Sequence, residues 1–307
     1  MPFTLSVEHL HRICKINSFP VASDEMVLFA LRGCLPATEE SQTFGREHEI
    51  VPAQLDYIHP RCTFGQWRPA KEEFALFPGS TVPHLSYVKN VNMATGRGAN
   101  QLMTGYYNDY RKGAHKAGKP TGHEAFRQVE GRPLSRTTDD YDFDTDDRVD
   151  FETPPDNLHA AWCMSVHHDK YASAGCQVVV GYPKCPQRGD LPDVGPWKAF
   201  KENAYAESQD SFGYFLLESL HAQRVALSSG APIGARLRFG SKSALVSELQ
   251  ERLKAEGFYE GRIDQSFGAR TLRAVLAFQS SAIATDADDG IVGHITASVL
   301  GMDLPGF

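Results

Sequence analysis

The apolar residues near the N-terminus recur at helical spacing and then give way to an unbroken apolar run. Intervals of three or four residues separate Val7, Leu10, Ile13 and Cys14. This spacing predicts a helix that buries one face. The run MVLFALRG at 26–33 follows, and its length and composition are typical of a buried strand. The polar stretch 36–50 predicts a loop.

The middle of the chain has the composition of short strands joined by long loops. Residues 51–135 are rich in Gly, Pro, Tyr and Asn, which favour turns and strands over helices. In SAGCQVVVGY, at 173–182, small residues precede a compact apolar run, which predicts another strand. The segment 197–224 is helical in pattern at both ends and has apolar positions at Phe212, Phe215 and Leu216.

The pattern changes after the stretch SSGAPIGAR at 228–236, whose small residues indicate a flexible linker. One apolar stripe then consists of Leu245, Leu249 and Leu253. Ser243 is placed to cap this helix, and Gly257 to end it. A second helix is predicted from about Ala269, and a short third one from about Ile295 to Leu300. We therefore predict an N-terminal domain at 1–227, a linker at 228–236 and a three-helix domain at 237–307.

Composition narrows the possible classes of protein. The chain has 307 residues, of which 41% are hydrophobic and 22% charged, as in ordinary globular proteins. Because 31 basic residues face 38 acidic ones, the net charge of −7 argues against a nucleic-acid partner. The most apolar stretch, Met26 to Leu31, is far shorter than the roughly 20 residues of a membrane span. The first residues show no secretory signal peptide, which predicts synthesis in the cytoplasm.

Two further features of composition bear on metals and partners. The six cysteines form no CxxC pair, so a zinc ribbon is not indicated. Their scatter instead predicts buried free thiols, and we expect neither a cofactor nor a metal. Residues 139–152 hold eight acidic side chains, which predict a solvated loop.

The C-terminal segment resembles the three-helix peptidoglycan-binding domain of many bacterial cell-wall enzymes. The resemblance covers roughly 237–302, and its matching positions include Gln250, Gly257, Asp264, Phe267-Gly268, Thr271, Phe278-Gln279, Asp289-Gly290, Val292-Gly293 and Thr296. The glycines fit tight turns before helices, and Asp264 and Thr271 are placed to bond turn amides. The resemblance implies binding to peptidoglycan, with Tyr259 or Phe258 stacking on a sugar or a stem peptide.

A shorter motif in the N-terminal part resembles the YkuD-type L,D-transpeptidases. Those enzymes carry a histidine, a gap of about thirteen residues, and then Ser/Thr-His-Gly-Cys. Here His159 is followed at that distance by Ser173-Ala174-Gly175-Cys176. Ala174 replaces the second histidine of the pattern, and the arginine that usually follows the cysteine is absent. The resemblance implies an α+β fold with a β-rich YkuD-like catalytic domain, followed by the all-α wall-binding domain.

The same resemblance implies a cysteine enzyme that acts on stem peptides. Cys176 would attack a peptide carbonyl to form a thioester, and His159 would shuttle the proton. Gly175 would leave room for the substrate backbone, and Ser173 would orient the loop or the histidine. Substrate-binding residues are expected to be Arg136, His84 and Tyr259, with Arg132 or Arg188 as other replacements for the missing arginine. His115 is a further candidate for the substrate groove.

Three alternatives remain open at this stage. His221 lies 45 residues after Cys176, which is the order of NlpC/P60 cysteine peptidases of the cell wall. A metal peptidase would use His159 with His167 or His168 and a carboxylate. In a non-catalytic wall-anchoring protein, the SAGC turn would be purely structural.

The expected reaction is either hydrolysis, by an L,D-carboxypeptidase or endopeptidase, or transfer to an amine, by a transpeptidase. A wall enzyme without a signal peptide needs another way out of the cytoplasm. Delivery by a type VI-like secretion apparatus, as an antibacterial toxin, or action in phage lysis would bring it to the periplasm or cell wall. A toxin would require an immunity protein as a further partner.

Overall fold

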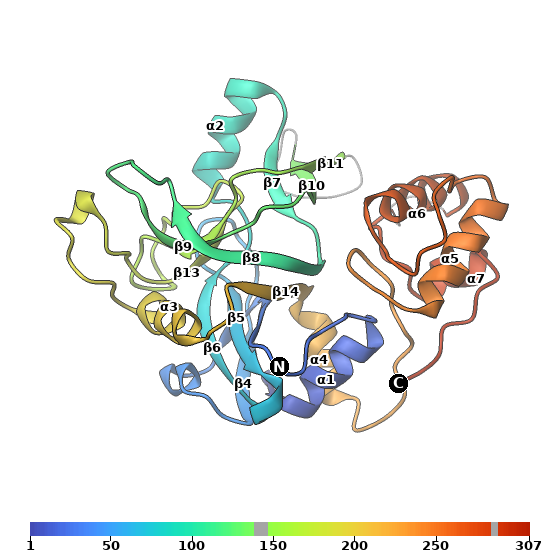
Figure 1. The fold of residues 1–307 in the computed structure, drawn as a ribbon, viewed down its shortest axis with the longest axis horizontal. Helices are drawn as coiled ribbons and strands as arrows, with labels where there is room; N and C mark the ends of the chain where they lie inside the picture. The colour runs from blue at the N-terminus through green and yellow to red at the C-terminus, as the bar shows by residue number, and fades with distance from the viewer. Residues whose placement is uncertain (138–146, 284–287) are drawn as a thin grey trace.

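The computed structural model describes residues 1–137, 147–283 and 288–307. Figure 1 shows a β-rich part, blue to yellow, beside a group of C-terminal helices in orange and red. The α+β composition and the small helical C-terminal region agree with the prediction. None of the helices in the described residues has the length and apolar character that crossing a bilayer requires.

The centre of the N-terminal part is a closed barrel of eight strands in the order β12-β13-β6-β5-β2-β14-β8-β9. Most neighbours are antiparallel, but β12 with β13 and β14 with β2 are parallel. The strands of the barrel are β2 (Val27–Arg32), β5 (Cys62–Arg68), β6 (Glu73–Ser80), β8 (Gly105–His115), β9 (His123–Arg127), β12 (Leu158–Ala160), β13 (Gln177–Val179) and β14 (Ser211–Glu218).

Helices and two smaller sheets surround the barrel. The sheets are β1-β4-β3, made of Phe3–Ser6, Glu47–Pro52 and Cys34–Pro36, and β11-β10-β7, made of Val149–Glu152, Arg132–Thr137 and Ala99–Leu102. The helices are α1 (Val7–Ile16), α2 (Leu85–Thr95), α3 (Pro196–Ala206) and α4 (Ser219–Leu227), and the 3-10 helices are η1 (Glu39–Gln42), η2 (Pro69–Lys71) and η3 (Pro186–Arg188).

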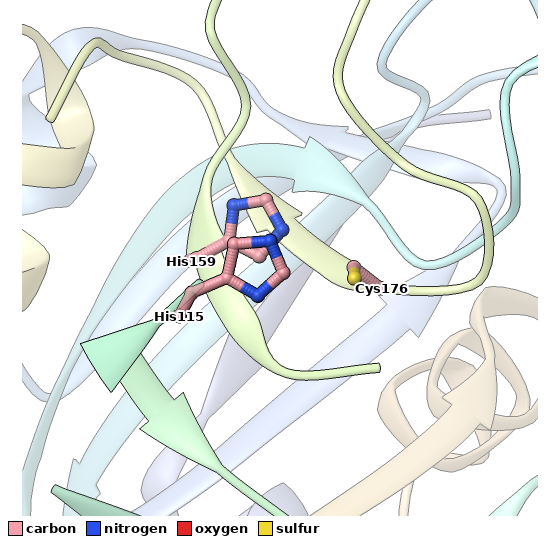
Figure 2. A group of neighbouring side chains, drawn as sticks. All are labelled: His115, His159 and Cys176. Atoms are coloured by element: carbon pink, nitrogen blue, oxygen red, sulfur yellow. The ribbon is translucent and has the colours of Figure 1, made fainter. Parts of the chain in front are cut away.

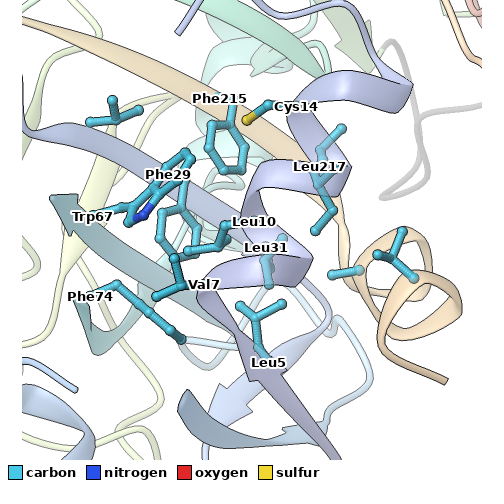
Figure 3. Close-up of a cluster of buried hydrophobic side chains, with 14 of the residues drawn as sticks. Leu5, Val7, Leu10, Cys14, Phe29, Leu31, Trp67, Phe74, Phe215 and Leu217 are labelled. Carbon is cyan, nitrogen blue, oxygen red and sulfur yellow. The ribbon is translucent and has the colours of Figure 1, made fainter. Parts of the chain in front are cut away.

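Alternation along β2 explains why its run is apolar throughout. Leu28 and Ala30 belong to a cluster that includes the barrel residues Phe64 and Tyr214. Phe29 and its alternate neighbours belong to a second cluster, which packs against α1 and α4. Figure 3 shows this outer cluster, where the rings of Phe29 and Phe215 stack with centroids 5.1 Å apart. A strand covered on both faces needs no polar positions.

The sequence prediction for these elements is largely confirmed, with two errors. The first is the helix α2, which lies in the stretch 51–135, whose composition predicts strands and loops. The helix at the N-terminus, the strand at 27–32 and helices at both ends of 197–224 are present. The segment 36–50 is not simply a loop, because it contains η1 and most of β4. Only Ile50 of β4 is buried, so the strand lacks the alternation by which a strand is recognised. Backbone pairing with β1 and β3 forms it instead.

Substitution of Gly65 by alanine tests the packing of the barrel. An added Cβ would lie 2.0 Å from Cζ of Phe29, inside a ring that is itself fully buried. We expect Gly65→Ala to lower the free energy of unfolding by about 1–3 kcal/mol, the usual cost of overpacking. Denaturant unfolding measures this cost. Gly234→Ala, where a Cβ meets nothing within 4 Å, is the matched control, and an equal loss in both variants would contradict the packing described here.

The C-terminal domain has the three predicted helices, α5 (Ala244–Ala255), α6 (Ala269–Ala282) and α7 (His294–Val299). Leu249, Leu253 and Val275 lie in its core. Ser243 occupies the N-cap position of α5, but its hydroxyl makes no capping bond, so that detail of the prediction is wrong. The backbone amide of Ser243 donates instead to the carbonyl of Gln265, which fixes the residue without its side chain.

Two buried glutamines hold the turns between these helices. Nε2 of Gln250 donates to Oδ1 of Asp264 at 2.9 Å and to Oγ1 of Thr271 at 3.1 Å. Asp264 also accepts from the amide of Ser266 at 3.0 Å, as predicted for a turn residue. Gln279 makes the equivalent bonds to Asp289, Ile291 and Thr296. Gln250 and Gln279, which are both among the positions of the resemblance, therefore make the same set of hydrogen bonds in two successive turns.

The segment predicted as a linker is hydrogen-bonded along its length. Arg12 of α1 donates to the carbonyl of Phe307 at 2.7 Å, and Ile233 exchanges two backbone bonds with the same residue. The amide of Tyr106 donates to the carbonyl of Phe239 at 2.9 Å, which joins β8 to the start of the helical domain. The two parts are therefore in direct contact. The proposed domain boundaries at 227 and 237 remain predictions.

Candidate functional site

Three neighbouring strands of the barrel present histidines on its outer surface. His115 ends β8 and lies opposite His123, the first residue of β9. His159 is the middle residue of β12. Leu158 and Ala160, on either side of it, belong to the cluster inside the barrel that also contains Phe64. Because side chains alternate along a strand, His159 points outward. Cys176 precedes β13. It lies outside the barrel in a separate buried cluster, the Cys176 cluster, together with Cys163 and with Val178, the residue that pairs with His159.

The structure brings the predicted pair His159 and Cys176 together and adds a third side chain. One donor atom from each of His115, His159 and Cys176 lies within 4.8 Å of the other two (Figure 2). The rings of His115 and His159 stack with centroids 4.1 Å apart and an angle of 17° between their planes. These three side chains are buried, with exposed fractions of 7%, 2% and 7% respectively.

A backbone hydrogen bond sets the tautomer of His159. Its Nδ1 lies 2.8 Å from the carbonyl oxygen of Ala160 and must donate there, because a carbonyl only accepts. Burial lowers the pKa of His159 well below its ordinary value, with the nearby His115 as a further cause, so the ring is neutral at pH 7. The lone pair is then on Nε2, which is buried and has no hydrogen-bond partner among the described residues.

The thiol of Cys176 is also neutral in the folded protein. Burial raises its pKa, and the carboxylate of Asp156 raises it further. The sulfur lies 3.9 Å from the carbonyl oxygen of Pro155 and 4.0 Å from Oδ1 of Asp156. The resting pair is therefore a thiol beside a neutral imidazole. Such a pair ionises only when the imidazole takes the proton as a general base.

Ser173 and Gly175 shape the turn that presents the cysteine. Oγ of Ser173 donates to the carbonyl of Cys176 at 2.7 Å and accepts from the amide of Gly175 at 3.3 Å. Gly175 has φ +140°, and a Cβ there would lie 2.7 Å from Oδ2 of Asp156 and from Cβ of Asn100. The space beside this glycine is therefore filled by protein, whereas we had expected room for a substrate backbone.

Asp156 is part of a chain of polar groups that the sequence did not reveal. Nδ2 of Asn100 donates to Oδ2 of Asp156 at 2.5 Å, and Arg136 donates to Oδ1 of Asn100. Burial raises the pKa of Asp156 to about 6. Arg136, a predicted substrate-binding residue, is itself buried and ion-paired with Asp150 at 3.1 Å and Glu152 at 2.7 Å. Arg136 thus holds Asn100, which in turn bonds Asp156 beside Cys176.

His84, another predicted substrate-binding residue, lies next to the turn. Its amide donates to the carbonyl of Ser173 at 2.8 Å. It lines a pocket of about 210 Å³ together with Trp162, Lys170 and Ala172 among others. Ala172 directly precedes the turn, so this pocket opens beside the SAGC segment.

Tyr259 lies in the C-terminal domain and is largely enclosed. It is 4% exposed, and its hydroxyl donates to the carbonyl of Arg262 at 2.8 Å. The ring is part of the core of the domain. The predicted stacking on a sugar or stem peptide would require this core side chain to become accessible.

The histidines of the alternative predictions lie elsewhere. His221 is on α4, and its Nε2 lies 3.1 Å from Nδ2 of Asn17, at the end of α1. His167 and His168 are exposed and do not belong to the group of donor atoms around Cys176. In the part of the chain that the structure describes, Cys176 and His221 are thus not paired. His159 forms no metal site there with His167 or His168. Most of the acidic run 139–152 lies outside the described residues.

Comparison with known families identifies the C-terminal part. Residues 242–300 match the family model described as "Putative peptidoglycan binding domain". Neither the curated proteins nor the solved structures contain a match to the chain. The match supports the predicted wall-binding domain and hence association with the cell wall, and it covers none of the residues around Cys176. The C-terminal region of the chain is thus similar to this peptidoglycan-binding family.

Proposed function

We propose that this protein is a cysteine enzyme that modifies the stem peptides of peptidoglycan. The observation that carries the proposal is the convergence of His159, on β12, with Cys176, which directly precedes the adjacent strand β13. The same chain also has a wall-binding domain. The motif shared with YkuD-type L,D-transpeptidases, at His159 and at 173–176, supports the same assignment. The binding domain raises the local concentration of the enzyme on its insoluble substrate.

The first half of the reaction uses the tautomer that the structure fixes. Nε2 of His159 takes the proton of the Cys176 thiol as the sulfur attacks the peptide carbonyl. A carbon–sulfur bond forms, the carbon–nitrogen bond breaks, and His159 passes its proton to the leaving amine. The carbonyl of Ala160, 2.8 Å from Nδ1, stabilises the imidazolium that exists between these transfers. The product is a thioester on Cys176.

The second half of the reaction depends on the acceptor. Water yields a carboxypeptidase or endopeptidase, and the amine of a second stem yields a transpeptidase. In either case His159 removes a proton from the acceptor and returns it to the departing sulfur. We propose that the stem peptide enters from the pocket beside Ala172, where Lys170 provides a cation for a peptide carboxylate.

The place of action follows from the substrate. We propose that the protein works in the periplasm or cell wall, in phage lysis or as a delivered antibacterial toxin. An immunity protein in the producing cell is expected in the case of a toxin. The C-terminal domain supports the wall as the destination.

The full chain is expected to bind the cell wall even when the proposed nucleophile is removed. The Cys176→Ala variant should co-sediment with insoluble sacculi, and soluble muropeptides should release it, because the binding domain does not include Cys176. The measurement is the bound fraction after centrifugation, with an unrelated acidic protein of similar size as the control. A bound fraction equal to that of the control would contradict wall association.

A non-catalytic anchoring protein is the second candidate, favoured by one observation. Cys176 is only 7% exposed, and burial raises its pKa, as for a structural cysteine. This candidate predicts the same wall binding with no change in the wall. The two candidates therefore differ in whether the stem peptides are altered.

A further inference from the structure

We propose that His115, His159 and Cys176 form a binding site for Zn²⁺. The donor atoms of the three side chains lie within 4.8 Å of one another. Tetrahedral zinc with bonds of about 2.0–2.3 Å places its ligands about 3.4–3.8 Å apart. A shift of about 1 Å in the side chains would therefore close the site around the ion. The proposal departs from the sequence-based expectation that no metal binds.

The framework around these donors holds them in place without a metal. They come from β8, β12 and the residue before β13, which belong to one closed barrel. Figure 2 shows the two imidazole rings stacked beside the side chain of Cys176. All three side chains are more than nine-tenths buried, so little water competes for the ion. Ligands on rigid neighbouring strands lose little conformational freedom on binding.

The hydrogen bond of His159 is the one expected of a metal ligand. A ligating imidazole usually donates its other ring N–H to a carbonyl or a similar acceptor. Nδ1 of His159 donates to the carbonyl of Ala160 and leaves Nε2, buried and without a partner among the described residues, free to coordinate. Nδ2 of Asn157 donates to Nδ1 of His115 at 3.0 Å. Coordination through Nε2 of His115 requires the Asn157 amide to turn its oxygen toward Nδ1.

The donor set selects the class of ion. Two imidazoles and a thiolate suit Zn²⁺ and bind Mg²⁺ or Ca²⁺ poorly, because those ions require oxygen ligands. Three protein ligands leave a fourth position for water, as in open zinc sites. On binding, the sulfur–zinc bond replaces the S–H bond, and one proton per ion is released to solvent.

The site has a consequence for the proposed reaction, and this consequence alone rests on the proposed function. Zn²⁺ would occupy both the sulfur that attacks and the nitrogen that takes its proton. Acyl transfer and metal binding would then exclude each other, so Zn²⁺ would inhibit the enzyme reversibly. His115, which the proposed reaction does not use, is the side chain that distinguishes the two activities.

The test uses Co²⁺ as a spectroscopic probe on the full chain freed of metal. We expect one equivalent of Co²⁺ to produce a thiolate-to-cobalt charge-transfer band and the visible bands of a tetrahedral ion, and Zn²⁺ to abolish both. Cys176→Ser should remove the charge-transfer band. His115→Gln should raise the dissociation constant for Co²⁺ at least tenfold. Loss of a mere hydrogen-bond partner of a metal ligand already costs about tenfold in affinity. Circular dichroism of each variant checks that it is folded.

Cys163→Ser is the matched control, since Cys163 is a buried cysteine of the Cys176 cluster. This variant should keep the full signal. Absence of the charge-transfer band in folded wild-type protein would overturn the proposal. So would a band that survives in Cys176→Ser, or equal affinity in folded His115→Gln. Activity on muropeptides in EDTA is assayed separately. A protein that binds Co²⁺ but never alters muropeptides keeps the zinc site and loses the proposed enzyme, and the reverse result does the opposite.

Discussion

Replacement of Cys176 by alanine is expected to reduce the turnover of stem peptides by about 10⁴- to 10⁶-fold, the scale of losing a catalytic nucleophile. The variant has no sulfur to form the thioester. The fold should persist, because Cys176 contributes only its thiol to the Cys176 cluster. The measurement is the rate of appearance of altered muropeptides by liquid chromatography.

Two further variants make this result interpretable. Cys176→Ser should also be nearly inactive, because an unactivated hydroxyl is a far weaker nucleophile than a thiol. Cys163→Ala removes a buried cysteine from the same cluster and should keep close to wild-type activity. Wild-type activity in Cys176→Ala would exclude the thioester route.

Replacement of His159 by alanine is expected to lower the rate by at least about a hundredfold, the lower end for loss of a general base. The reason is the neutral thiol, which burial and Asp156 hold in its protonated form. Loss of Nε2 of His159 removes the base to which the proposed reaction assigns that proton. The rate should recover partly as the pH of the assay rises and hydroxide ionises the thiol.

His221→Ala is the matched control for this variant, because His221 is also a buried, neutral histidine. It bonds with Asn17 on another part of the domain, and its loss should affect stability more than the rate per folded molecule. A hundredfold loss in His221→Ala together with a mild effect in His159→Ala would assign the base to His221. The NlpC/P60-like alternative would then replace the present one.

The sequence predicted the C-terminal domain almost completely, and the physical reason is its local character. Its helices arise from 3.6-residue periodicity, and its turns from Asp264 and the glycines within a few residues of each helix. Each of these signals lies within about fifteen residues of the element it specifies. The segment 36–50 failed for the opposite reason, since β4 depends on backbone pairing with β1 and β3 and carries little apolar pattern.

The candidate site was only half visible in the sequence. His159 and Cys176 could be paired because they belong to one short motif. Asp156 and Asn100 could not be placed, because β7, β10 and the segment before β12 bring them together across more than fifty residues. His115 was noted as a candidate for the groove, but its stacking on His159 depends on the order β12-β9-β8 in the barrel. Closure of a barrel is a long-range property that no local pattern carries.

Mass spectrometry of sacculi treated with the purified protein tests the central claim most directly. After digestion of the glycan strands, the account predicts muropeptides with shortened, cleaved or newly joined stem peptides. These products should appear with the wild-type protein and be absent with Cys176→Ala at equal wall binding. Unchanged muropeptides in a sample that contains folded, wall-bound wild-type protein would contradict the account, as would products that the Cys176→Ala variant forms equally well.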